Sequence, residues 1–161
     1  MTRVKMARKP DMDLWPNDIA PPDVRQPRQI LEHQASLIES KTGGRIRGEV
    51  AQEVNQGRIT LSFLLTDASS GYRVRIFYCT HGKDVPYPVT VYAQQLNTEK
   101  DPGMRMLMSM PAIPANTQDE FTSLLSKVFY AGETRAAVQA ILARQSDAEA
   151  AKPAESKDKD S

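Results

Sequence analysis

The stretch that decides the fold is residues 46–78, IRGEVAQEVNQGRITLSFLLTDASSGYRVRIFY. In each of its three segments, apolar side chains recur at every second position, which is the period of a β-strand with one buried face. The segments are separated by residues 55–57 (Asn-Gln-Gly) and 69–71 (Ser-Ser-Gly), both typical of tight turns. The sequence therefore predicts an antiparallel meander, which a fourth alternating run over residues 87–93 extends.

Helical patterns flank this meander on both sides. Residues 27–42 repeat apolar side chains at helical spacing, with a proline at the first position and two glycines after the end. Residues 117–145 return to this spacing, begin with the capping-box pair Thr117 and Glu120, and are divided into two helices by Gly132. The order predicts an α+β fold: an N-terminal helix, a four- to five-stranded antiparallel meander sheet, and two C-terminal helices packed on one face.

The two ends of the chain differ from this domain in composition. Residues 1–22 contain four of the 11 prolines and no sustained periodicity, which predicts a disordered or extended arm. The largest apolar group of the arm is the pair Leu14 and Trp15, which makes the arm a candidate to lie across the sheet. Residues 146–161 are charged and poor in apolar side chains, which predicts a disordered tail. A single domain is expected over residues 23–145.

Composition and charge exclude several classes of function. The 21 Lys and Arg against 20 Asp and Glu give a net charge of +1, too small to hold the whole chain on nucleic acid or an anionic membrane. The chain lacks the apolar runs of a membrane span or a secretory signal, so a cytoplasmic protein is expected. One cysteine and two histidines match no closed zinc pattern, and no nucleotide-binding motif occurs, so neither a metal nor a cofactor is predicted.

A group of arginines on the predicted strands is the first candidate binding site. By alternation the face away from the apolar residues should carry Arg45, Arg47, Arg73, Arg75 and the aromatic Phe77. Such a patch can contact a partner's carboxylates, or it can bind nucleic acid with Phe77 as a stacking platform. Glu49 and Glu53 fall on the same face and can neutralise part of it.

The loop at residues 81–88, HGKDVPYP, adds His81 and Tyr87 to this candidate surface. If the preceding strand continues to His81, Cys79 shares a face with it, and a thiol beside an imidazole can act as a nucleophile with its base. No orienting acid is fixed at this spacing, although Asp84 is near in sequence, so no catalytic residue is predicted. An enzyme is the third alternative.

Four of the seven methionines, Met104, Met106, Met108 and Met110, are spaced by two. On a strand their thioethers would share one face. This spacing predicts a fifth strand whose methionines either fill the core or form an adaptable binding surface.

A resemblance accompanies these patterns. The run PRQILEHQASL at residues 27–37, followed by KTGG at 41–44 and GEV at 48–50, resembles the opening of a group of small uncharacterised bacterial proteins. Later stretches are similar too: YRVRIF at 72–77, YPV at 87–89 and ETR at 133–135. The group has no assigned activity, ligand or catalytic residue. The resemblance therefore implies the architecture and a bacterial origin, without a function.

Together these patterns predict a non-enzymatic module for protein–protein interaction or self-association, accessory or regulatory in role, that acts through the exposed sheet face. Nucleic-acid binding through the strand arginines is the alternative. No membrane partner is expected.

Overall fold

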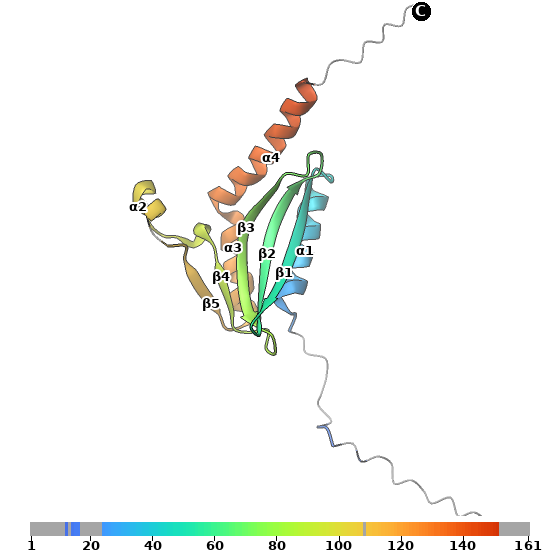
Figure 1. The fold of residues 1–161 in the computed structure, drawn as a ribbon, viewed down its shortest axis with the longest axis vertical. Coiled ribbons are helices and arrows are strands. Elements are labelled where there is room, and N and C mark those ends of the chain that lie inside the picture. Colours follow the sequence, from blue (N-terminus) through green and yellow to red (C-terminus); the bar gives the residue numbers. More distant parts are fainter. Residues whose placement is uncertain (1–11, 13, 17–23, 108, 152–161) are drawn as a thin grey trace, which may run out of the picture.

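The computed structural model describes residues 12, 14–16, 24–107 and 109–151. It has the predicted α+β fold, with an N-terminal helix, a five-stranded antiparallel sheet and two C-terminal helices (Figure 1). In chain order the elements are α1 (Pro27–Lys41), β1 (Ile46–Asn55), β2 (Arg58–Asp67), β3 (Arg73–Gly82), β4 (Val89–Tyr92), the 3₁₀ turn η1 (Gln94–Leu96), α2 (Pro102–Leu107), β5 (Ala112–Ala115), α3 (Gln118–Tyr130) and α4 (Gly132–Ala151).

The strands lie in the sheet in the order in which they occur in the chain, β1-β2-β3-β4-β5, so β1 and β5 are its edges. The helices α1, α3 and α4 lie on one face of this sheet (Figure 1). Below we call the other face the open face. The hydrophobic core fills the space between the sheet and the three helices, as expected for an antiparallel sheet with one solvated side.

Helix α1 begins and ends where its sequence predicts. The side chain of Gln29 accepts a hydrogen bond from the backbone N–H of Gln26 (3.1 Å), and the glycines after the helix have positive φ angles, which favour a helix stop. The helix lies very close to β1, because a Cβ placed on Gly48 would be only 2.5 Å from the Cα of Ala35. Glycine at this position therefore permits the direct contact between helix and strand.

A β-bulge in β3 overturns one prediction. Phe63 pairs with Phe77 and Leu64 pairs with Arg75, so Ile76 is an extra residue in the register. Its carbonyl oxygen instead accepts a hydrogen bond from Gln95 Nε2 (3.1 Å). The extra residue reverses which face each later side chain occupies. The predicted placement of Phe77 on the open face is therefore wrong, and this side chain is buried in the core.

The first two methionines of the run, Met104 and Met106, lie in a helix and not in a strand. Residues 102–107 are α2, and its start is stabilised by the side chain of Asp101, which accepts a hydrogen bond from the N–H of Gly103 (2.9 Å). Met104 and Met110 are exposed, which removes both from the core. The fifth strand follows the run and includes Pro114, which an edge strand tolerates because it needs fewer backbone donors.

Helix α3 begins where its capping pattern predicts, whereas α4 ends later than predicted. Thr117 Oγ1 accepts a hydrogen bond from the N–H of Glu120 (3.2 Å), as its capping pattern predicts. Helix α4 continues through Ala151, so the expected tail boundary at residue 146 lies inside this helix. Most of the predicted N-terminal arm, and residues 152–161 of the predicted tail, lie outside the described residues.

Candidate functional site

The predicted arginine patch is only partly assembled. Arg47 pairs with Thr66 in register, Thr66 pairs with Arg73, and Leu64 pairs with Arg75, which places these three arginines on the open face. Arg45 precedes β1 and is exposed. The guanidinium of Arg73 forms an ion pair with Glu49, so part of the positive charge on this face is neutralised within the sheet.

The aromatic group on the open face is Tyr78 and not Phe77. The Tyr78 ring stacks on Tyr92 of β4 with 4.7 Å between centroids, and the Arg75 guanidinium lies 4.8 Å above the same ring. These contacts occupy the Tyr78 ring within the protein. Alternation without the bulge predicted Tyr78 on the core side of β3, and the extra residue moves it to the open face.

The loop residues of the candidate surface have structural contacts. His81 is buried, and its Nδ1 lies 2.8 Å from the carbonyl oxygen of Gly82. The hydroxyl of Tyr87 donates a hydrogen bond to the carbonyl of Arg25 (2.9 Å), which ties the loop to the segment before α1. Both side chains therefore have contacts within the folded chain, and their part in binding stays a prediction.

The enzyme alternative depends on the thiol of Cys79. Cys79 lies on the core side of β3 and is fully buried. Burial raises the pKa of this thiol to about 12, so the sulfur stays protonated at neutral pH. Cys79 and His81 share the buried face of β3, where a substrate has little access to the sulfur, and the enzyme alternative stays a prediction.

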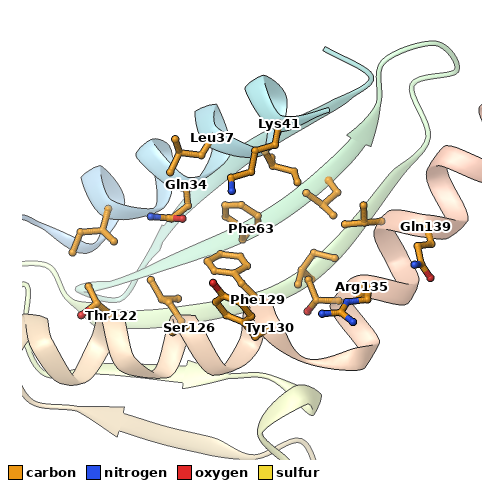
Figure 2. Close-up of a pocket in the computed structure, with 17 residues that line it drawn as sticks. Gln34, Leu37, Lys41, Phe63, Thr122, Ser126, Phe129, Tyr130, Arg135 and Gln139 are labelled. Carbon is orange, nitrogen blue, oxygen red and sulfur yellow. The ribbon is translucent and has the colours of Figure 1, made fainter. Parts of the chain in front are cut away.

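The main concave site of the described residues is on the helix-covered side, between α1 on one side and α3 with α4 on the other (Figure 2). We call it the helix groove. It has a volume of about 660 Å³, within the range usual for binding sites. Its lining comprises Ile30, Gln34, Leu37, Ile38, Lys41, Phe63, Leu65, Ile76, Thr122, Leu125, Ser126, Phe129, Tyr130, Thr134, Arg135, Val138 and Gln139.

Aromatic rings form the centre of the helix groove. Phe63 of β2 and Phe129 of α3 meet edge to face at 5.2 Å between ring centroids, and Phe77 on the neighbouring strand stacks with Phe63 at 5.5 Å. Such pairs hold one another in a fixed geometry. The apolar base of the groove is therefore pre-formed, while Leu37 and Tyr130 at its margins are exposed, Tyr130 to 79%.

The charged residues of the helix groove are all basic. Lys41 extends from the end of α1, Arg135 from the first turns of α4, and the two lie on opposite sides of the central phenylalanines (Figure 2). No Asp or Glu lines the groove, and neither cation forms an ion pair with a described residue. The site thus combines an apolar base with two cations available to an anionic group.

The sequence contained a signal for this groove. Gln34, Leu37 and Lys41 are spaced by three and four along α1, so they share one side of the helix. Leu37 lies between two polar residues on this side, which marks a helix face that the core does not fully cover. The distance between α1 and α3, which leaves room for the groove, could not be predicted from the sequence.

Comparison with known protein families, with curated proteins and with solved structures finds no match to the chain. The bacterial origin implied by the sequence resemblance stays a prediction. Over residues 24–107 and 109–151, no helix combines the length and apolarity needed to cross a membrane. The same residues bring no three His, Cys, Asp or Glu side chains together in a way that could hold a metal ion.

Proposed function

We propose that this protein is a non-enzymatic protein-interaction module, accessory or regulatory in role, whose principal binding site is the helix groove. The observation that carries the proposal is a pre-formed apolar concavity with an aromatic base, two cations and no carboxylate in its lining. Apolar side chains that stay exposed around a concavity, as Leu37 and Tyr130 do, are typical of interaction sites. A bacterial, cytoplasmic setting belongs to the same proposal.

A polypeptide segment suits this groove better than a small ligand. Small-molecule sites enclose most of the ligand surface, whereas the margins of this groove remain exposed at Leu37 and Tyr130. The 15 residues of α1 give the groove a side about 22 Å long. About seven residues of extended chain span that length. Charge complementarity with Lys41 and Arg135 favours a segment whose apolar side chains are flanked by carboxylates.

The open face, which the sequence analysis favoured, is the weaker of the two surfaces. Its ion pair between Arg73 and Glu49 and the contacts around Tyr78 leave few unpaired groups for a partner. The nucleic-acid alternative rests on the strand arginines, and the stacking platform that Phe77 would have added is absent because this ring is in the core. The groove therefore carries the proposal.

Fluorescence anisotropy with two labelled peptides tests the proposal. In one short peptide leucines alternate with aspartates, and in the other they alternate with lysines. We expect the full chain to bind the Leu–Asp peptide and to ignore the Leu–Lys peptide at moderate salt. In the double variant Lys41→Glu/Arg135→Glu this preference should reverse, because the charge of the groove changes from positive to negative. Both side chains are exposed, so the substitutions should leave the fold intact.

The matched control is Arg47→Glu/Lys127→Glu, which changes the net charge by the same amount away from the groove. It should keep the preference of the natural chain. If the control loses that preference as completely as the groove variant does, binding depends on overall charge and the proposal fails. The absence of binding to either peptide, both in the natural chain and in the variant Asp11→Lys/Asp13→Lys with an altered N-terminal arm, would also contradict it.

A further inference from the structure

We propose that the helix groove binds the chain's own residues 11–19, DMDLWPNDI, which we call the arm segment, in the same molecule. This inference rests on the proposed function, because it names one particular polypeptide that fills the groove. In this arrangement the arm segment covers the binding site until a partner with the same chemistry displaces it.

The side chains of the arm segment have the chemistry that the groove selects. Met12, Leu14 and Trp15 are 80%, 82% and 74% exposed, so three large apolar side chains within four positions contact water. Exposure on this scale is a cost that burial in an apolar concavity removes. These side chains therefore complement the apolar surface that the groove leaves accessible at Leu37, Phe129 and Tyr130.

The charges match as well. Residues 10–24 contain four aspartates, Asp11, Asp13, Asp18 and Asp23, and no Lys, Arg or His. The helix groove has the opposite composition, with Lys41 and Arg135 and no carboxylate in its lining. An apolar segment flanked by carboxylates can therefore place its side chains on the rings while its charges pair with the cations at the margins.

The connection to α1 is long enough for binding within one molecule. Eleven residues lie between Trp15 and Pro27, and the twelve Cα–Cα steps that join the two span up to about 40 Å. Because α1 forms one side of the groove and is about 22 Å long, Trp15 can reach any point along it. A tether of this length gives an effective concentration on the order of millimolar.

Proline content favours an extended arm segment over a helical one. Pro16 within the arm segment, and Pro21 and Pro22 just after it, fix φ and restrict the residues before them to extended backbone. An extended chain fits lengthwise between two helices, and the restricted backbone has less conformational entropy to lose on binding. This lowers the cost of ordering the arm in the groove.

The other end of the chain does not have this chemistry. Residues 152–161, KPAESKDKDS, carry three acidic and three basic side chains and no apolar group larger than proline. Such a segment has no large apolar side chain to pack against Leu37 and Tyr130 of the groove. The first nine residues contain four cations, Arg3, Lys5, Arg8 and Lys9, which Lys41 and Arg135 would repel. The arm segment is therefore the part of either end that fits.

Trp15 makes the proposal directly measurable, because it is the only tryptophan of the chain. We expect its fluorescence in the full chain to be shifted to shorter wavelength and to be quenched severalfold less by acrylamide than in urea. The double variant Lys41→Glu/Arg135→Glu should release Trp15 and restore full quenching. The arm variant Asp11→Lys/Asp13→Lys should do the same without any change inside the folded domain.

Combining the two double variants should restore protection of Trp15, because the charges are then complementary again in the opposite sense. The control variant Arg47→Glu/Lys127→Glu should leave Trp15 protected. Protection that is independent of protein concentration supports binding within one molecule. Protection that appears only at high concentration, together with a dimer in sedimentation, would overturn this in favour of a second copy.

The failure of this inference can be told apart from failure of the proposed function. If Trp15 of the natural chain is as fully quenched as in all variants, the arm does not occupy the groove and the inference is wrong. Binding of the Leu–Asp peptide under those conditions would leave the proposed function standing. If the peptide does not bind either, both proposals fail.

Discussion

Replacing Gly48 by alanine should force α1 away from the sheet. The added Cβ would lie 2.5 Å from the Cα of Ala35, 2.7 Å from its Cβ and 2.8 Å from its carbonyl oxygen. Carbon atoms in contact are normally about 3.5–4.0 Å apart, so the helix must shift by about 1 Å. Two of the three contacts are with backbone, so no change of rotamer relieves them. We expect a loss of about 3 kcal/mol in the free energy of unfolding, equivalent to roughly 10 °C in Tm.

Urea denaturation followed by circular dichroism measures this loss. The matched control is Gly132→Ala, where no atom lies within 4 Å of the added Cβ and φ is not positive, so its stability should be unchanged or slightly higher. Adding Ala35→Gly to Gly48→Ala removes one of the three contacts and should recover part of the loss. A Gly48→Ala protein within about 0.5 kcal/mol of the natural chain would refute this packing of α1 on β1.

Three further predictions concern the interior. Hydrogen bonds, first from the Gln145 side chain and then from Ser69, hold the pKa of Asp67 well below its usual range. Because the pKa of Asp67 is lower in the folded chain than in the unfolded chain, its ionised form stabilises the fold above about pH 4, and this contribution is lost as the pH falls further. The variant Asp67→Asn should therefore show a weaker fall in the free energy of unfolding at acidic pH. Burial raises the pKa of the Cys79 thiol to about 12, so this thiol should react with an alkylating reagent only after the chain unfolds. Rapid modification of the folded chain would contradict the buried position of Cys79. Thr134→Val removes the 2.6 Å hydrogen bond to the Val128 carbonyl between α3 and α4 and should lower the urea midpoint by the equivalent of about 1–2 kcal/mol, whereas an unchanged midpoint would show that this bond contributes nothing.

The local signals of the sequence were sufficient for most of the fold. Turn residues at 55–57 and 69–71 located the hairpins, and the Thr117 cap located the start of α3. These features depend on interactions between residues near one another in sequence, which a pattern can reveal. The predicted class and the arrangement of helices on one face followed from them.

The errors came from features that local alternation does not encode. One extra residue in β3, Ile76, moved Phe77 into the core and Tyr78 onto the open face. The bulge carbonyl is bonded by Gln95, a residue nineteen positions later, so its partner is visible only in the folded chain. Likewise, the spacing of the methionines by two predicted a strand, whereas Asp101 and Pro102 start helix α2 at this place.

The candidate site was the least predictable feature. The predicted residues Arg73, Phe77, His81 and Tyr87 are each engaged in contacts within the protein. The helix groove instead forms where two helices far apart in sequence, α1 and α3, lie on the same face with a space between them. Such a space is a property of tertiary packing, so no single segment of sequence contains it.

The most direct test of the binding site is an NMR titration of the isotope-labelled full chain with the Leu–Asp peptide. Binding in the helix groove predicts that the largest changes in backbone amide shifts cluster on the two sides of the groove, at Leu37, Ser126 and Gln139. Changes concentrated instead at Thr80 and Thr90 on the open face, or no changes at all, would contradict the groove as the interaction site.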